Sequence, residues 1–418
     1  MMFDFFRSSM PKLTERDFQR IEKYRRCWLY FSSPDGDPYR SEDGTPDMAA
    51  FKELPEYVST FFNYAPFVVS TDLHLLNGDF RMSSLSVSGG VRRTNAVHKF
   101  LETAGLPSAV REAMLTALVC GDAWLKVIPA LDGPGARIVA VDPAAVHPRL
   151  DPHDYTVERE IVVHYAFRDL DDSIHRRTEK WSAQHVEVWQ DGVPLQEETG
   201  PNPLGRIPFV HFAACRVPGS YFGRSCFEDI VADMDKLNSA LGAVLEVYRY
   251  YGSPKLVLKG VMAPEIELDP DVRQFWQIPS GDAELSFLEW RNATGLLDEL
   301  LKLDAVIRRK LPEFILERVS ERSYQSSGFA LSIQLSLLDA KIQGLATEFG
   351  ESVGRAARMA LEAAGLSSEG VRFSFSPHLS TSWREKADAV EKLLDMGVMA
   401  GDEARKALSV DEFANGSQ

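Results

Sequence analysis

One short stretch of the chain gathers several groups that could bind a metal ion or transfer protons. Its members are His147, Asp151, His153 and Asp154. Imidazole and carboxylate groups are common zinc ligands, but Pro148 and Pro152 make this stretch an irregular turn, and no H-x-x-x-H helix accompanies it. The other histidines are scattered singly along the chain. The spacing therefore favours neither a metal site nor a catalytic constellation.

A second motif resembles the turn that presents a catalytic serine. Gly223-Arg-Ser-Cys-Phe227 follows the nucleophile-elbow pattern except that Phe227 replaces its second glycine. The same residues suit the start of a long helix. Ser225 would be its N-cap, Glu228 would complete a capping box, and Asp229 would add a second acid where the helix dipole favours one. We expect this structural role and not a nucleophile.

Two further kinds of chemical motif are missing from the sequence. A phosphate-binding G-x-x-x-x-G-K-[ST] loop is absent, since Gly133-Pro-Gly135 lacks the lysine and the helix that must follow, so a ring ATPase or nucleic-acid motor is not expected. The four cysteines contain no C-x-x-C pair and indicate neither a disulfide framework nor a zinc knuckle. We therefore predict a protein that is not an enzyme and has no cofactor.

Composition limits the remaining classes of protein. The 418 residues correspond to about three domains, and a hydrophobic share of 44% is enough for a packed core. With 61 acidic and 46 basic residues the net charge is −15, which argues against coating DNA or anionic membranes. No apolar run approaches 18 residues, and Met1 to Met10 lacks an apolar signal-peptide core, so we expect an intracellular chain outside the membrane.

The first half of the chain predicts an α+β domain. Asn95 to Cys120 reads as two helices split at Gly105, followed by a strand over Ala123 to Ile128. Short strands with turns fill residues 136 to 212, and Asp191-Gly192 predicts a hairpin. The aromatic stretch Phe51 to Leu76 reads as a buried helix broken near Pro66. Its lack of interleaved basic residues favours core packing over base stacking.

The second half predicts long helices around a small insert. An apolar stripe runs through Ser225 to Tyr251, a helix about 40 Å long. The insert that follows carries seven acids between Glu265 and Glu289 against Arg273 alone. A second helix covers Leu296 to Leu311, and a third, Phe329 to Ala364, follows a polar stretch and contains three glycines that suggest close contacts or a kink. The remaining predicted elements are a strand over Val371 to Phe375 and short helices over Trp383 to Leu394 and Gly401 to Leu408.

The order of these elements resembles that of the portal, or head-to-tail connector, proteins of tailed bacteriophages. Several short phrases agree with the family in the same order along the chain. They are Gly121-Asp-Ala-Trp-Leu-Lys-Val127, Val141-Asp-Pro143, Arg149-Leu-Asp-Pro152, Gly205-Arg-Ile-Pro-Phe-Val210, Gly223-Arg-Ser225, Leu237-Asn238, Ser253-Pro254 with Gly260, Ser327-Gly-Phe-Ala-Leu331, Glu385-Lys-Ala-Asp388 and Gly397-Val-Met-Ala400. The phrases lie between about residues 55 and 408, and their order is more specific than any one of them. The short tail after Phe375 departs from family members with a large crown.

The resemblance implies an α+β, predominantly helical fold with a wing, stem, clip and crown that assembles into a ring of twelve subunits. The implied divisions are a wing (1–224), a stem helix (225–251), a β-rich clip (252–293), a second stem helix (294–311), a tunnel loop (312–328), a long kinked helix with a wing strand (329–382) and a short helical crown (383–418). Physical reasoning agrees with a ring, because two helices with one apolar stripe each, and an insert of roughly forty residues, need neighbours to bury their apolar surface.

The resemblance also implies which residues meet DNA and partners. In the tunnel loop these are Arg318, Arg322, Ser323, Tyr324 and Gln325, and the second choice is Arg308, Arg309 and Lys310. The loop residues could instead pair with Glu317 or Glu321 between subunits, and the second set could simply complement a helix dipole. The clip surface facing the terminase or adaptor would carry Glu265, Glu267, Asp269, Asp271, Arg273, Asp282 and Glu284.

The implied function is a channel for genome packaging and ejection at one capsid vertex. The implied partners are double-stranded DNA, which would pass through the channel without sequence specificity, the terminase, a head-tail adaptor, the major capsid protein and a scaffolding protein. No membrane and no metal are implied. The implied location is the virion, and the host cytoplasm during assembly. Two alternatives stay open: another ring-forming scaffold of the head-tail junction without a DNA tunnel, and an intracellular enzyme with an unrecognised site.

Overall fold

The computed structural model describes residues 10–32, 62–77, 82–130, 135–169, 171–252, 256–259, 275–278, 293–315 and 328–375. Contacts divide the chain into two units, of which unit 2 comprises Met48–Tyr64 and Asp229–Lys310 and unit 1 comprises the rest. Each unit is treated by itself. The described residues contain no helix that combines the length and the apolar character needed to cross a membrane.

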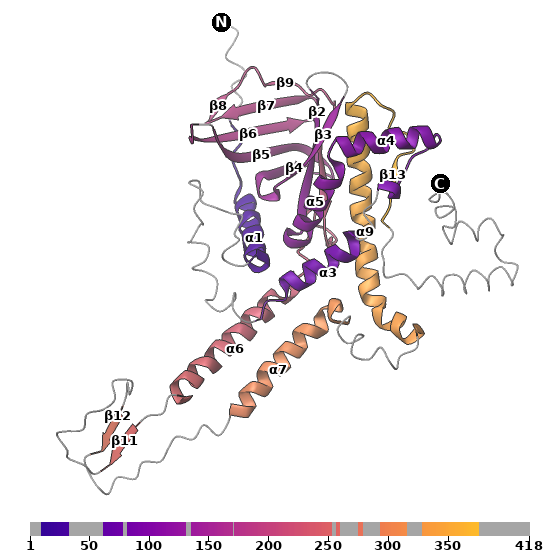
Figure 1. Ribbon diagram of the computed structural model, residues 1–418. Coiled ribbons are helices and arrows are strands. Elements are labelled where there is room, and N and C mark those ends of the chain that lie inside the picture. Colours follow the sequence, from indigo (N-terminus) through magenta and orange to yellow (C-terminus); the bar gives the residue numbers. More distant parts are fainter. Residues whose placement is uncertain are drawn as a thin grey trace, which may run out of the picture. The chain divides into compact units, whose positions relative to one another are not determined.

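Unit 1 mixes helices with antiparallel sheets, as the α+β prediction requires (Figure 1). Its helices are α1 (Glu15–Ser32), α3 (Ala65–Asn77), α4 (Val91–Thr103), α5 (Leu106–Cys120) and α9 (Gly328–Ala363), with short 3-10 turns η2 (Met82–Ser84), η3 (Pro143–Ala145) and η4 (Pro312–Phe314). Its strands are β1 (Leu85–Ser86), β2 (Asp122–Pro129), β3 (Ala136–Val141), β4 (Val146–Leu150), β5 (Glu158–Arg168), β6 (Ile174–Ser182), β7 (His185–Gln190), β8 (Val193–Pro194), β9 (Gly200–Pro201), β10 (Phe209–Ala213) and β13 (Arg372–Phe373).

A three-stranded sheet with the order β10-β2-β3 forms the centre of unit 1. Helices α5 and α9 both pack against it (Figure 1). Strand β10 is buried along its whole length, and β2 is buried through Leu125. A sheet covered on both faces needs apolar residues at successive positions, which explains the continuous apolar runs in these two strands.

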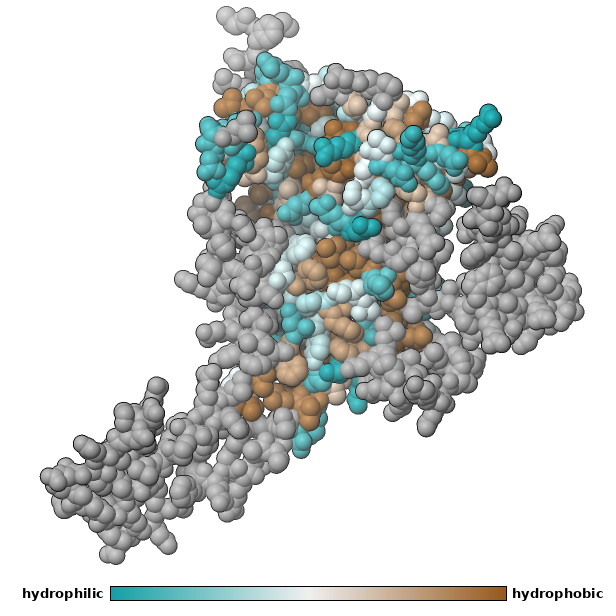
Figure 2. Space-filling view, in the orientation of Figure 1, coloured by the Kyte–Doolittle hydropathy of each residue, from teal (hydrophilic) through white to brown (hydrophobic). Residues whose placement is uncertain are grey.

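The second sheet of unit 1 is a six-stranded antiparallel meander in the order β4-β5-β6-β7-β8, with β9 paired to β7. The predicted hairpin at Asp191-Gly192 is confirmed, because both residues have positive φ, 51° and 80°, as a type I′ turn requires. A core cluster joins the two sheets through Trp124, Val146, Ile161, Val163 and Phe209. Hydrophilic residues gather over the strand ends of this sheet and over one end of α4 (Figure 2).

The helical predictions for unit 1 are close to the structure. The expected break between α4 and α5 falls at Gly105, whose φ of +85° is one that glycine adopts without strain. Helix α9 is close-packed where its glycines were expected to allow it, since a Cβ on Gly350 would lie 3.3 Å from the carbonyl oxygen of Phe373. The strand over Val371 to Phe375 alternates buried and exposed residues and pairs with β1.

Unit 2 contains the two helices that flank the small insert. They are α6 (Glu228–Gly252, with its body from Asp229 in unit 2) and α7 (Ala293–Lys310), and between them the strands β11 (Leu256–Lys259) and β12 (Phe275–Ile278) pair in parallel. Helix α6 begins three residues later than predicted. The two predicted C-terminal helices, Trp383 to Leu394 and Gly401 to Leu408, lie outside the described residues.

The predicted capping box at the start of α6 is wrong. The Ser225 hydroxyl donates to the carbonyl oxygen of Leu118 at 3.3 Å, and it lies 3.5 Å from the amide of Phe227. The Glu228 carboxylate pairs with Lys23 and Arg224 and does not reach back to the serine amide. The helix starts later because the residues after Ser225 form a turn whose Cys226 amide donates to Leu118.

Candidate functional site

Most of the site residues predicted from the sequence lie outside the described part of the chain. This holds for all five tunnel-loop residues, Arg318, Arg322, Ser323, Tyr324 and Gln325. It also holds for all seven clip residues, Glu265, Glu267, Asp269, Asp271, Arg273, Asp282 and Glu284. The structure therefore describes one predicted set, the cations at the C-terminal end of α7, and several buried polar clusters that the sequence did not reveal.

Two of the three cations on α7 are paired within unit 2. The Nε of Arg308 lies 2.8 Å from a carboxylate oxygen of Asp304 one turn earlier, and the guanidinium lies 5.9 Å from the ring centre of Tyr64. The Lys310 ammonium pairs with Asp233, which ties the end of α7 to the beginning of α6. These two side chains have structural partners inside their own unit.

Arg309 differs from its two neighbours. Its side chain is exposed and has no ion pair with any described residue. Of the three cations, Arg309 therefore has the charge most available to a partner. All three also lie in the last turn of α7, where positive charge is favourable to the helix dipole.

Asn238 of α6 fixes the segment before α3 by a pair of hydrogen bonds. Its side-chain oxygen accepts from the amide of Phe62 at 3.1 Å, and its side-chain nitrogen donates to the carbonyl oxygen of the same residue at 3.0 Å. The Asn238 side chain is fully buried, so both bonds satisfy groups that water cannot reach. The Leu237-Asn238 phrase marked this position, but the sequence did not show its partner.

Several family phrases meet around Asp122 in the core of unit 1. Its carboxylate accepts hydrogen bonds from the Tyr24 hydroxyl at 2.7 Å and the Gly223 amide at 2.8 Å, and it lies 2.8 Å from Nε2 of His211. A Cβ on Gly223 would lie 2.2 Å from the carbonyl oxygen of Gly121, so the close approach of these chains requires glycine. The phrases at 121–127 and 223–225 are therefore explained by packing.

The His211–Asp122 pair is the described arrangement nearest to a catalytic dyad. The imidazole is 3% exposed and stacks against the rings of Trp124 and Tyr221, with centroids 4.6 and 4.7 Å away. Among the described residues, no serine or cysteine side chain hydrogen-bonds to its ring, so the nucleophile that a triad needs is missing. Ser225, the candidate nucleophile from the sequence, is buried and bonded to Leu118.

A cluster with excess positive charge surrounds Asp17 at the start of α1. Its carboxylate lies 3.0 Å from Arg149, 3.3 Å from Arg20 and 3.5 Å from Nδ1 of His147, and it accepts from Thr14, the residue that caps the helix. Burial alone would raise the pKa of Asp17, but the contacts with His147 and Arg149 and the bonds from Thr14 lower it well below its usual range. The spacing Thr14-x-x-Asp17 was the available sequence signal.

A cluster with excess negative charge occupies another part of unit 1. The Lys341 ammonium of α9 lies 2.8 Å from a carboxylate oxygen of Asp72 on α3 and also pairs with Glu313 of η4. Both acids are completely buried. Nothing in the sequence pattern singled out these three residues, because their positions are far apart along the chain.

The four residues between His147 and Asp154 that could have been metal ligands each have other partners in the structure. His147 is buried beside Arg20, whose guanidinium lies 2.8 Å from its Nδ1. Asp151 and Asp154 instead organise their own turn, accepting from the amides of His153 and Thr156 at 2.7 and 2.9 Å. The four residues therefore do not form one ligand set.

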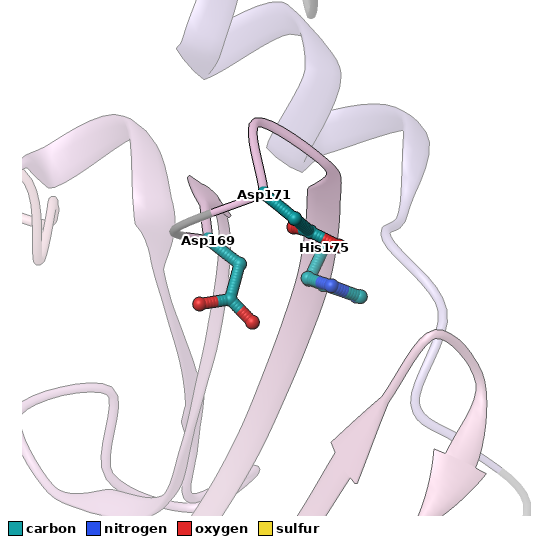
Figure 3. Close-up of side chains that lie close together, drawn as sticks. All are labelled: Asp169, Asp171 and His175. Atoms are coloured by element: carbon teal, nitrogen blue, oxygen red, sulfur yellow. The ribbon is translucent and has the colours of Figure 1, made fainter.

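A different trio could hold a cation by distance alone. Asp169, Asp171 and His175 lie together at the turn between β5 and β6 (Figure 3). Both ring nitrogens of His175 already have partners, since Nδ1 lies 2.7 Å from the Asp191 carboxylate and Nε2 lies 2.8 Å from the Ser173 hydroxyl. The trio is thus a hydrogen-bonded turn, and the two acids are exposed.

Comparisons with known proteins place these features in a family. No curated protein matches the chain. A chain of a solved structure, "Virion of native gene transfer agent (GTA) particle", is similar with a TM-score of 0.37 and 10% sequence identity, over 82% of this chain and 93% of that chain. The family described as "Phage portal protein, SPP1 Gp6-like" matches residues 84–412. Because that match covers well over half of the sequence, the chain belongs to the SPP1 Gp6-like family of phage portal proteins.

Proposed function

We propose that this portal protein forms a ring of twelve subunits at one capsid vertex and that double-stranded DNA enters and leaves through the channel of the ring. Portal proteins are structural components of the phage virion, and they oligomerise and assemble with other capsid components. The observation that best supports the proposal is the division of the chain, in which residues 229–310, together with residues 48–64, form a unit separate from unit 1.

The proposed divisions of the chain are those that the resemblance to portal proteins implies. Residues 1–224 form the wing, 225–251 and 294–311 the stem, 252–293 the clip, 312–328 the tunnel loop, 329–382 the kinked helix with its wing strand, and 383–418 a short crown. Helix α6, the paired strands β11 and β12, and helix α7 follow one another in the order helix, strands, helix that a stem and clip need. The first residues of the proposed tunnel loop form η4, and they are packed inside unit 1.

Charge supports a channel through which DNA moves without being held. Each phosphate that a protein neutralises adds affinity, so a channel of strongly basic residues would oppose sliding. The chain has a net charge of −15, and two of the three cations at the end of α7 are already paired with acids. We propose that the sparse contacts to DNA come from the tunnel-loop residues Arg318, Arg322, Ser323, Tyr324 and Gln325, and secondarily from Arg309.

Electron microscopy of the purified full-length protein tests the ring directly. We expect particles with rotational symmetry and a central hole wide enough for duplex DNA, about 20 Å across. Small particles without a hole would overturn the proposal, and rings whose hole is closed would favour a head-tail scaffold that does not conduct DNA.

A packaging assay tests the role of the tunnel loop. The double variant Arg318→Ala, Arg322→Ala should form normal rings and package or retain less DNA. The matched control is Arg92→Ala with Arg111→Ala, because both of these arginines are exposed on helices of unit 1. Equal packaging by both double variants would remove the tunnel loop from the proposed site.

The acidic clip is the proposed docking surface for the terminase and then for the adaptor. Its seven residues, Glu265, Glu267, Asp269, Asp271, Arg273, Asp282 and Glu284, carry six negative charges against one positive charge. Reversal to lysine at Glu265 and Glu267 should slow association with a terminase and make it less dependent on salt. An unchanged association rate at low salt would assign docking to another surface.

A further inference from the structure

The buried cluster of Asp72, Glu313 and Lys341 joins three elements of unit 1 at one point. Lys341 lies on α9 and contacts Asp72 on α3, with 2.8 Å between the ammonium and the carboxylate, and it also pairs with Glu313 of η4. Next to the cluster, the rings of Phe67 on α3 and Phe314 on η4 pack with their centroids 4.8 Å apart. Lys341 thus connects helix α9 to helix α3 and to the 3-10 turn η4.

The cluster contains more acid than base. Both Asp72 oxygens and one Glu313 oxygen, Oε2, have no hydrogen-bond partner among the described residues, although Oδ2 of Asp72 lies 2.8 Å from the Lys341 ammonium. Two buried carboxylates facing one ammonium would leave a net negative charge away from water, which is costly. Burial raises the pKa of Asp72 to about 7; Lys341 opposes that rise and Glu313 adds to it. Asp72 is therefore partly protonated around neutral pH, which removes part of the excess negative charge.

Other titratable groups near the cluster do not take over that proton. Burial raises the pKa of Cys215 to about 11 and that of Cys226 well above its usual value, so both thiols stay neutral. Two further charged residues also act on the pKa of Cys215: Glu348 raises it and Arg224 lowers it. Among the groups near Lys341, Asp72 is thus the one whose charge changes around neutral pH.

The cluster lies at the base of the proposed tunnel loop. Glu313 lies in η4, which ends at Phe314. After Ile315 come residues 316–327, and α9 begins after them at Gly328. The amide of Phe314 donates to Leu311 at 3.3 Å, and the amide of Ile315 donates to the carbonyl oxygens of Pro312 and Glu313, so these backbone bonds lie within residues 311–315. Its attachment to the rest of unit 1 depends on buried side chains, chiefly Glu313 and Phe314.

We propose that Lys341 is a positioning residue, which by binding Glu313 and Asp72 fixes η4 against α3 and α9 and so sets where the tunnel loop leaves the wing. The inference rests on the proposed function in one respect, that residues 316–327 belong to the tunnel loop. This anchor is sensitive to pH, because the proton on Asp72 is lost as the pH rises through the pKa of that carboxyl.

Hydrogen exchange in the full-length protein tests the anchor. Replacing the lysine by Lys341→Met leaves two buried acids without a counter-ion, and exchange in residues 311–315 should become roughly tenfold faster or more. Lys341→Arg keeps the charge and should keep much of the protection. The reference is the β5–β6 hairpin, which does not contact the cluster. Equal loss of protection in η4 and in the hairpin would mean a general structural role and would overturn the proposal, as would no loss in η4.

A second variant gives a readout that does not depend on Lys341→Met folding. Because the folded state holds a proton on Asp72 that the unfolded chain loses above about pH 4, the protection of η4, corrected for intrinsic exchange, should fall between pH 5 and pH 8. Asp72→Asn mimics the protonated acid and should make the protection equal at both pH values. A pH dependence of the η4 protection that persists unchanged in Asp72→Asn would overturn the role of the Asp72 proton in this anchor.

Packaging separates this inference from the proposed function. If the anchor holds and the tunnel loop contacts DNA, Lys341→Met should reduce packaging by rings that still assemble. If exchange in η4 accelerates and packaging stays normal, the anchor stands and the DNA role of the loop fails. If packaging falls in Arg318→Ala, Arg322→Ala but η4 exchange is unchanged in Lys341→Met, the function stands and the anchor fails.

Discussion

Two buried charge clusters in unit 1 differ in composition: one has an excess of basic groups and the other an excess of acidic groups. At the start of α1, a single acid, Asp17, lies among Arg20, Arg149 and His147. At the base of η4, a single base, Lys341, lies between two acids. Both clusters hold elements that are distant in the sequence, yet one has surplus positive charge and the other surplus negative charge. Since the buried surplus is reduced by gaining or losing protons, the two clusters respond to pH in opposite directions.

The directions follow from which state binds more protons. Contacts with its basic neighbours lower the pKa of Asp17, so its contribution to stability is present above pH 4 and is lost as the pH falls. Burial, together with the nearby His147 and Arg149, lowers the pKa of His164 to about 4, so its contribution is full above pH 6.5 and is lost toward pH 4. For Asp72 the raised pKa means that stability falls as the pH rises from about 4 to 7.

The largest effect on stability is expected from removing the base of the acidic cluster. Lys341→Met should lower the free energy of unfolding by about 3–5 kcal/mol, because it leaves two buried carboxyls unpaired. The matched control is Lys99→Met, since Lys99 is exposed on α4. Thermal unfolding of both variants measures the difference. A similar small shift in both would mean that the buried pairing contributes little.

Removing the acid of the basic cluster should have the next largest effect. Asp17→Asn leaves Arg20, Arg149 and His147 facing one another without a counter-ion, and we expect a loss of roughly 2–4 kcal/mol at pH 7. The loss should shrink below pH 4, where Asp17 is increasingly protonated in the unfolded chain. Denaturant unfolding at pH 7 and at about pH 3 measures it, with Glu102→Gln on the surface as control. A loss independent of pH would indicate lost packing and not lost charge.

The sequence predicted much of the fold because its signals are local. The boundary between α4 and α5 follows from Gly105, and the β7–β8 hairpin follows from Asp191-Gly192. The same locality explains the errors. A Ser-x-x-Glu spacing predicts a capping box at Ser225, but Glu228 finds Lys23 on α1 in the folded chain. Periodicity and turn residues report neighbours along the chain, and they do not report such a distant partner.

The buried clusters could not be predicted for the same reason. Asp72, Glu313 and Lys341 look like ordinary helix-surface charges in the sequence, and only the packing of α3, η4 and α9 makes them buried. Asp122 is different, because it lies inside a family phrase, and its partner Gly223 lies inside another. Resemblance could therefore mark these two positions, while the contact that explains them required the structure.

A smaller and pH-dependent effect is expected at His164. Its Nδ1 lies 2.8 Å from the Thr178 hydroxyl, a contact that asparagine can imitate. The protonated imidazole is disfavoured in the folded state, so part of the stability lost between pH 6.5 and pH 4 comes from this residue. His164→Asn should remove that part, about 1 kcal/mol, and leave stability at pH 8 nearly unchanged. If the stability of His164→Asn fell between pH 6.5 and pH 4 as much as that of the wild type, the fall would come from Asp17 and His147 and not from His164.

The smallest effect on stability, and the one that separates structural from functional charge, is expected on α7. Arg309 is exposed and unpaired among the described residues, so Arg309→Ala should change the free energy of unfolding by less than about 0.5 kcal/mol. Arg308→Ala removes the pair with Asp304 and the contact over Tyr64, so it should destabilise unit 2 more than Arg309→Ala does. If Arg309 meets DNA in the channel, only its removal should alter packaging without altering unfolding. Packaging that falls only in Arg308→Ala would show that the charges at the end of α7 act through the fold, as the buried clusters do.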